Sequence, residues 1–143
     1  MRITITLCFT GDLLDPEKIT SILNVIPHVS RCKGDVRVLP TKKEIVSKFG
    51  LWEWRSKDAS ETLTINDHIN RLKSTFEHVY NLFPNLPNVE NTWVDICIVD
   101  SKGEGGDSSV SFLLDKESTV VLRDIGLPIE FTIYRSLPEA SVA

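Results

Sequence analysis

Three segments of this chain alternate apolar with polar residues, and that pattern restricts its fold more than any other feature. The apolar positions are Ile3, Ile5, Leu7 and Phe9 near the start, Val94, Ile96 and Ile98 later, and Ile129, Phe131 and Ile133 near the end. Successive side chains of a β-strand point to opposite faces of its sheet. The alternation therefore predicts strands that each bury one face.

The segment after the first strand carries helix signals with a single apolar stripe. Asp15 and Pro16 predict a helix start, because aspartate can cap the first free N–H groups and proline suits the first helical position. The stripe consists of Ile19, Ile22, Leu23 and Ile26. Pro27 ends the helix, because the residue before a proline avoids the helical conformation.

The longest predicted helix begins at Thr64, which with Asp67 resembles a capping box. Its apolar residues recur every three or four positions and are Ile65, Ile69, Leu72, Phe76, Val79 and Phe83. This spacing predicts about five turns that end at Pro84 and Pro87. A shorter helix is predicted over 118–125, with Gly126 as its C-terminal cap.

The segment 29–58 is predicted to be mostly extended. Lys33-Gly34-Asp35 is typical of a turn, and residues 42–49 fit either a short helix or a strand. Trp52 and Trp54 would share one face of a strand. Three roles are open to them: core packing, protein contact or nucleobase stacking. We expect at least one of them to anchor the strand to the sheet. Whether the other, beside Arg55 and Lys57, lies on the surface for a partner stays open.

These elements together predict a single α+β domain over residues 1–143. A further strand is expected at Val110, Phe112 and Leu114, before the short helix. The predicted architecture is one mainly antiparallel sheet with two or three helices packed on one face, and a ferredoxin-like plait is the first topology to compare. The last residues are expected to be loose.

The cysteines and the overall hydropathy predict a cytoplasmic protein without cofactors. No run of about 18 apolar residues occurs, and the N-terminus lacks the continuous apolar run of a signal peptide. Cys8, Cys32 and Cys97 are odd in number and form no CxxC motif. We therefore expect free thiols, with Cys8 and Cys97 buried, and no metal site.

The charge is unevenly distributed along the chain. Residues 31–57 contain eight basic and three acidic residues, a net charge of +5, so the remainder carries −9 of the total of −4. Such asymmetry bears on the choice of partner. It leaves open a single-stranded nucleic-acid binder through 31–57, although the acidic total charge makes nucleic acid the less favoured partner.

The sequence contains no known catalytic motif, but it leaves open one set of catalytic residues around His68. His68 and His78 do not have the i, i+4 spacing of HExxH ligands, and no GxSxG motif occurs. The alternative to a binding protein is an enzyme of unrecognised type that uses His68 with Asp67 or Asp95.

The glycine-rich stretch 103–109 does not fit a phosphate-binding loop, because Asp107 stands where the motif needs a lysine. Asp100, Glu104 and Asp107 also lack the spacing of an EF-hand. A solvated connection between strands is the simplest interpretation. A contact with a basic partner or a weak metal site is the alternative.

Several short motifs, in their order along the chain, resemble a bacterial domain-of-unknown-function family, number 4279. They are Phe9, residues 14–20 (LDPEKIT), Leu23, Pro27, Lys33-Gly34-Asp35, Trp54-Arg55-Ser56 after Gly50, His68-Ile69, and a turn at Gly126 leading to Tyr134. The resemblance implies a compact α+β cytosolic domain and no particular reaction. In size and setting such domains are also similar to immunity proteins of bacterial toxin systems.

The function expected from the sequence is therefore non-enzymatic protein binding, with neutralisation of a basic toxin as one form of it. The candidate contact residues are Trp52, Trp54, Arg55, Asp100, Glu104 and Asp107. Tryptophan and arginine are enriched at interfaces, and an acidic surface would steer a basic partner toward the chain. The oligomeric state stays open.

Overall fold

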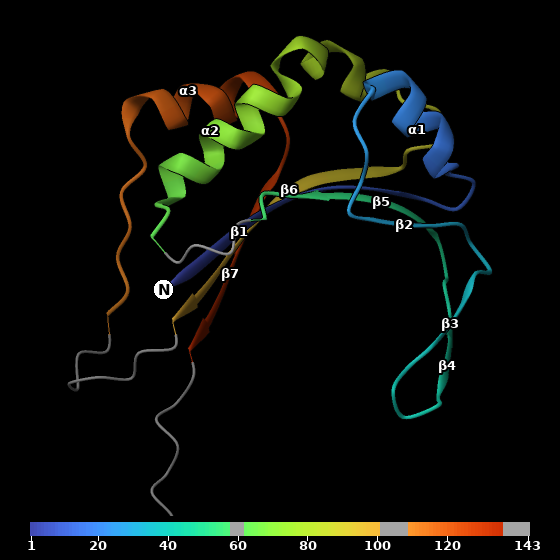
Figure 1. Ribbon diagram of the computed structural model, residues 1–143. Helices are drawn as coiled ribbons and strands as arrows, with labels where there is room; N and C mark the ends of the chain where they lie inside the picture. Colours follow the sequence, from blue (N-terminus) through green and yellow to red (C-terminus); the bar gives the residue numbers. More distant parts are fainter. Residues whose placement is uncertain (58–61, 101–108, 136–143) are drawn as a thin grey trace, which may run out of the picture.

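A five-stranded sheet with helices on one face forms the body of the protein (Figure 1). The computed structural model describes residues 1–57, 62–100 and 109–135. The strands follow the order β2-β5-β1-β6-β7 across the sheet. Their bounds are β1 Arg2–Gly11, β2 Val29–Arg31, β5 Gly50–Arg55, β6 Asn91–Asp100 and β7 Ile129–Arg135.

All strand pairs in this sheet are antiparallel except β6–β7, which is parallel. The parallel pair is joined by a crossover helix, as a parallel connection requires. The predicted α+β class with a mainly antiparallel sheet is confirmed. The molecule shares the layers of a ferredoxin-like plait but not its connections, because both neighbours of the central β1 run antiparallel to it.

Three α-helices and one 3₁₀-helix cover the same face of the sheet (Figure 1). They are α1 Pro16–Leu23, α2 Ile65–Phe76, η1 Glu77–Asn85 and α3 Lys116–Ile125. Side-chain caps begin the α-helices at Asp15, Thr64 and Asp115. Thr64 and Asp67 form both hydrogen bonds of the predicted capping box.

The core lies between the sheet and these helices, and both tryptophans of β5 belong to it. Trp52 is opposite Phe9 on β1, with ring centroids 5.5 Å apart. The ring of Trp54 packs edge-on against Phe76 of α2 at 5.1 Å. The Trp52 indole N–H donates to Thr20 Oγ1 at 3.0 Å. The side chain of Trp52 is 0% exposed and that of Trp54 is 8% exposed.

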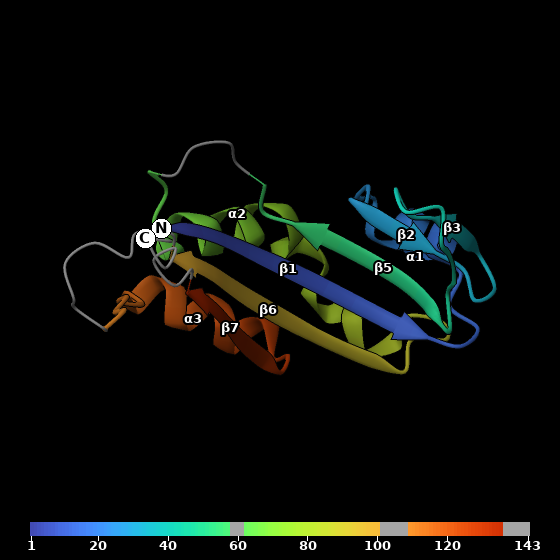
Figure 2. The ribbon, with the colours of Figure 1, turned by 90° about the horizontal axis from the view of Figure 1, so that it is seen from below.

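A β-hairpin extends from the sheet beyond its β2–β5 end. Its strands are β3 Val36–Val38 and β4 Glu44–Val46, so residues 42–49 contain a strand and not a short helix. The hairpin points away from the helices, and Figure 2 shows the sheet face that the helices leave uncovered. The sheet and the hairpin together form an arch with a concave underside (Figure 1).

Three sequence-based expectations about helices and strands differ from the observed structure. Helix α1 ends at Leu23 and not at Pro27, because Asn24 adopts the left-handed conformation and caps the helix, so Ile22 and Ile26 are exposed and not part of a buried stripe. Residues 109–115 form no strand; the backbone around Leu113 and Asp115 instead bonds to the Asn66 side chain of α2. The apolar alternation of this segment arises because Val110, Phe112 and Leu114 pack against the edge of the core. The long helix ends at Phe76 and continues as η1, whose buried Val79 and Phe83 extend the same apolar face.

The expectations for the loop 101–108 and for residues 136–143 lie outside the described residues. In the described ranges, no helix combines the length and the apolar content that a bilayer span requires.

Candidate functional site

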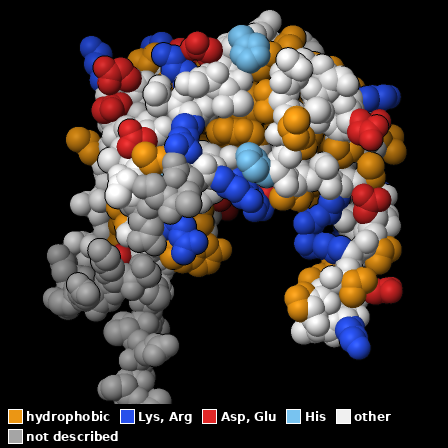
Figure 3. Space-filling view, in the orientation of Figure 1, with side chains coloured by type: hydrophobic (Ala, Val, Ile, Leu, Met, Phe, Trp, Pro, Cys, Tyr) orange, Lys and Arg blue, Asp and Glu red, His pale blue; other side chains and the backbone are white. Residues whose placement is uncertain are grey.

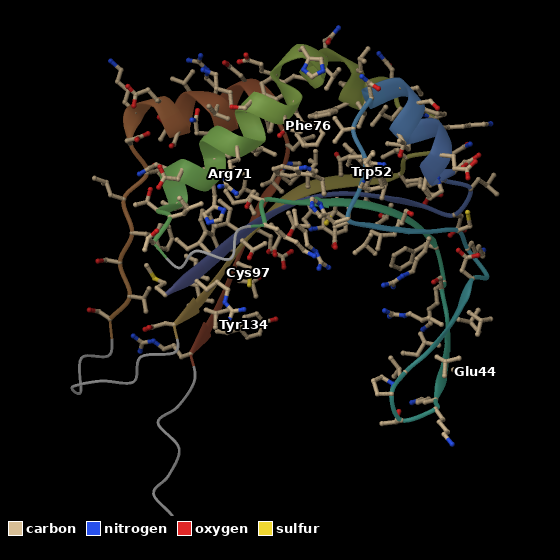
Figure 4. The ribbon with its side chains drawn as sticks, viewed as in Figure 1. Glu44, Trp52, Arg71, Phe76, Cys97 and Tyr134 are labelled. Carbon is tan, nitrogen blue, oxygen red and sulfur yellow. The ribbon has the colours of Figure 1, made fainter. Side chains whose placement is uncertain are left out.

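The helices of the described chain leave one face of the sheet uncovered, here called the open face (Figure 2). Strand register places alternate residues of β1, β5, β6 and β7 on it. They include Thr6, Cys8, Leu51, Glu53, Arg55, Trp93, Asp95, Cys97, Thr132 and Tyr134. Figure 4 shows Cys97 and Tyr134 on this underside, and Trp52 and Phe76 on the opposite side of the sheet.

The polar groups at the centre of the open face bond to one another. Glu53 Oε2 accepts from Arg55 Nε at 2.8 Å, and Glu53 Oε1 accepts from the Cys8 thiol at 3.6 Å. Asp95 Oδ1 accepts from the Thr132 hydroxyl at 2.9 Å. These bonds fix the side chains and satisfy one or both oxygens of each carboxylate. The centre of the open face is therefore a pre-organised polar surface.

The two cysteines of the open face are poor nucleophiles. Burial raises the pKa of the Cys8 thiol well above its usual range, and the neighbouring Glu53 carboxylate raises it further. Burial and Asp95 likewise raise the pKa of Cys97. Since the thiolate is the reactive form, both thiols stay protonated at neutral pH. Cys8 is buried as predicted, whereas Cys97 is half-buried.

The hairpin exposes large apolar side chains. Val36, Val38 and Val46 share its outer side and are 57%, 64% and 55% exposed. Phe49, between the hairpin and β5, is 48% exposed. A two-stranded hairpin has only marginal stability of its own. Exposed apolar patches of this kind mark interaction surfaces.

The surface between the hairpin and the opposite end of the sheet is hollowed, and lysine and arginine side chains gather at its roof and on its hairpin side (Figure 3). The basic segment 31–57 supplies this side of the arch, because it comprises part of β2, the hairpin and β5. The basic residues that cluster between positions 31 and 57 of the sequence therefore also cluster in space, along the concave surface.

The structure separates the candidate contact residues. Trp52 and Trp54 are both in the core, so the folded chain offers neither indole to a partner, although the sequence left open a surface position for one of them. Arg55 lies on the open face, and Asp100 ends β6. Glu104 and Asp107 lie outside the described residues.

The groups of the enzyme hypothesis are also separated. His68 is 2% exposed, and its Nδ1 lies 2.8 Å from the Ser56 hydroxyl. Asp67 accepts from the Thr64 backbone N–H in the capping box, which lowers the pKa of its carboxyl group. Asp95 lies on the open face, on the other side of the sheet from α2. In the described ranges, no three His, Cys, Asp or Glu side chains gather as a metal site would require.

The residues missed from the sequence lie where the hairpin meets the sheet, above all Arg31 of β2 and Arg37 of β3. In the sequence, both arginines contribute only to the count of basic residues in the segment 31–57. A signal for Arg37 was present, because it lies between Val36 and Val38 and so faces away from them in a strand. That alternation does not show which side of the hairpin faces the sheet.

The family comparison covers nearly the whole chain. Residues 1–136 match the model of the domain of unknown function DUF4279, so the chain belongs to this family, and the resemblance seen in the sequence is confirmed. A search of curated proteins and a search of solved structures each found no match.

Proposed function

We propose that this chain is a non-enzymatic protein-binding domain whose contact surface comprises the open face and the β3–β4 hairpin. The observation that carries the proposal is the hairpin, whose three valines are more than half exposed and whose neighbour Phe49 is 48% exposed. A protein that kept such a patch in water without use would risk aggregation, whereas a partner that covers it gains the free energy of apolar burial.

The concave shape supports the same function. An arch with a rigid sheet as its roof and a projecting hairpin as one side can enclose a segment of a partner. The open face adds the aromatic side chains Trp93, which is half-buried, and Tyr134, which is 58% exposed. Tryptophan and tyrosine are enriched at protein interfaces because they combine a large apolar area with a polar group.

The chemistry of the open face also favours binding over catalysis. Its thiols are held protonated, and its carboxylates Glu53 and Asp95 accept hydrogen bonds from neighbouring side chains. A general base needs a free basic group in reach of a substrate proton. Fixed, internally bonded polar groups instead provide a pre-organised surface, which lowers the entropic cost of association.

Photo-crosslinking in cells tests the proposal. A benzophenone amino acid would replace Val38 on the hairpin, Tyr134 on the open face, or, as a matched control, the exposed Glu117 on α3. We expect the Val38 and Tyr134 positions to crosslink the same protein and the Glu117 position to give no such product. Crosslinks to nucleic acid alone, or none from Val38 and Tyr134, would contradict protein binding.

Neutralisation of a toxin is the particular form of binding that we propose to test next. The chain would be co-expressed with the product of the adjacent gene, with and without Val36→Glu and Val38→Glu in the hairpin. We expect the unaltered chain to restore growth and the hairpin variant, checked for folding by circular dichroism, to fail. Equal growth with and without the chain would contradict toxin neutralisation. Binding to another protein would then still be tested by the crosslinking experiment.

A further inference from the structure

A pocket of about 230 Å³ lies where the hairpin meets the sheet. We call it the corner pocket. Three cationic and four apolar residues line it, together with Ser47: Arg31, Arg37, Lys48, Ile45, Val46, Phe49 and Leu51. In Figure 4 the labelled Glu44 lies on the side of the hairpin away from the concavity. Arg37 and Ile45, which face opposite to Glu44 by strand register, therefore line the concave side.

Backbone pairing holds the two walls of the corner pocket in place. On the sheet, Arg31 of β2 is directly opposite Leu51 of β5. On the hairpin, Arg37 of β3 is directly opposite Ile45 of β4. Each wall thus places one guanidinium group beside one apolar side chain on the same face.

The turn at the base of the hairpin joins these walls. Asp35 Oδ2 accepts from the Cys32 backbone N–H at 2.8 Å, and the Asp35 carbonyl accepts from Ser47 N at 2.8 Å. Gly34 N donates to the Ser47 carbonyl, also at 2.8 Å. The hairpin therefore leaves the sheet in a direction fixed by hydrogen bonds, and the pocket exists before any ligand binds.

The three cations of the corner pocket form no ion pair with another residue in the part of the chain that the structure describes. The nearby acids are turned to other partners: Asp35 bonds to the backbone of Cys32, and Glu53 bonds to Arg55. No acidic side chain lines the pocket. No side chain that lines the pocket therefore neutralises its positive charge.

We infer that the corner pocket binds an acidic segment of a partner protein, in which carboxylates flank a large apolar side chain. The inference rests on the proposed protein-binding function and specifies the chemistry of the partner. Guanidinium groups bind carboxylates through paired hydrogen bonds, and two of them converge here from different strands. Ile45, Phe49 and Leu51 provide the apolar surface beside them.

A nucleic acid is the competing ligand for a cationic pocket, but the aromatic composition opposes it. Single-strand binders add stacking platforms to their cationic groove. Here Phe49 is the one aromatic side chain that lines the pocket, and the two tryptophans of β5 are in the core. Phosphates would also leave the apolar part of the pocket without a partner, unless bases entered it.

Fluorescence anisotropy with designed peptides tests the inference on the full chain. The probe is a fluorescein-labelled decapeptide in which aspartates flank a central phenylalanine. One control peptide replaces the aspartates by asparagine, and another replaces the phenylalanine by alanine. We expect the probe to bind, both control peptides to bind at least about tenfold more weakly, and the affinity to fall with added salt.

Two charge-reversal variants locate the binding. Arg37→Glu with Lys48→Glu changes two cations of the corner pocket, and Lys18→Glu with Lys116→Glu makes the same change of net charge at exposed positions on the helices, outside the pocket and the hairpin. We expect the first variant to lose at least about tenfold in affinity and the second to lose less than about threefold.

Each remaining outcome overturns the inference. No binding of the probe, equal binding of a control peptide, or an equal effect of the two variants contradicts an acidic ligand in this pocket. Displacement of the probe by oligothymidylate at a lower concentration than by unlabelled peptide favours a nucleic acid. If these results occur while Val38 and Tyr134 still crosslink a protein, the proposed function stands and only the corner pocket loses its role.

Discussion

The Ser56 hydroxyl oxygen lies 2.8 Å from His68 Nδ1 and 2.8 Å from the backbone nitrogen of Ile5. The Ile5 N–H donates to this oxygen, so the hydroxyl hydrogen is available to His68. Both side chains are 2% exposed. The pair therefore joins the end of β5, the central strand β1 and helix α2 inside the protein. Its position identifies it as a structural connection.

Replacement of Ser56 by alanine is expected to destabilise the fold by about 1–3 kcal/mol, because it leaves the buried Ile5 N–H and the His68 imidazole without their shared partner. Urea unfolding measures the free energy of unfolding. Ser74→Ala, at an exposed serine whose hydroxyl donates to the Asn70 carbonyl, is the matched control and should change stability by less than about 0.5 kcal/mol. Equal effects of both changes would contradict a special role for Ser56.

Thr20 accepts the hydrogen bond of the buried Trp52 indole, so Thr20→Val tests the role of Trp52 in the core. Valine keeps the shape of threonine but removes the acceptor, and the cost expected is about 1–2 kcal/mol. Thr119→Val, at an exposed position of α3, is the control. Thermal unfolding followed by circular dichroism measures both. An unchanged melting temperature for Thr20→Val would mean that the indole finds another acceptor.

Stability is expected to fall as the pH is lowered below about 6.5, with His28 contributing. Burial lowers the pKa of His28, and the charges of Lys57 and Arg55 lower it further, against the opposing effect of Glu53. Its Nδ1 accepts the Arg55 backbone N–H at 2.9 Å, which only the neutral ring can do. The unfolded chain therefore binds the proton more readily, so this contribution is present above the unfolded pKa and is lost as the pH falls through the folded pKa.

The variant His28→Asn isolates this contribution, because asparagine offers an acceptor that does not titrate. The difference in urea midpoint between about pH 7.5 and pH 5 should be smaller in His28→Asn than in the unaltered chain. Ser74→Ala, at an exposed serine of α2 that does not titrate, should leave that difference unchanged. A pH dependence that survives His28→Asn in full would assign it to other groups.

The three cysteines are expected to react with iodoacetamide in the order Cys32, Cys97, Cys8. Cys32 is exposed, Cys97 is half-buried, and Cys8 is buried with its thiol bonded to Glu53. Burial raises the pKa of all three thiols, most strongly for Cys8. Peptide mass spectrometry over time gives the rates. In about 6 M guanidinium the differences should nearly vanish, and early labelling of Cys8 without denaturant would contradict the position described for it.

Local features of the chain could be predicted from the sequence because their causes lie within a few residues. Asp15 and Pro16 begin α1, Thr64 and Asp67 form the capping box of α2, and Gly126 ends α3 in the left-handed conformation. Each of these depends on hydrogen bonds or backbone preferences between near neighbours. Strand alternation is likewise a local pattern, and β1, β5, β6 and β7 follow it.

The candidate site could be predicted only in part, because its residues are brought together by pairing between distant segments. Arg31 and Leu51 are opposite each other only through the β2–β5 register, and Arg37 joins them only through the direction of the hairpin. The alternation at 110–114 predicted a strand, but an apolar face can pack on a helix edge as well as in a sheet. Periodicity reports which residues are buried together, not which element buries them.

The sequence by itself determined the longer strands, the starts of the first two helices and the α+β class, since these follow from propensity, periodicity and the chain's local hydrogen bonding. Only the tertiary structure decided which face of each strand the helices would cover. That choice placed Trp52 and Trp54 in the core and Glu53 and Arg55 on the open face, although all four alternate on one short strand. The physical reason is that burial of a strand face depends on the free energy of packing against segments far away in the chain.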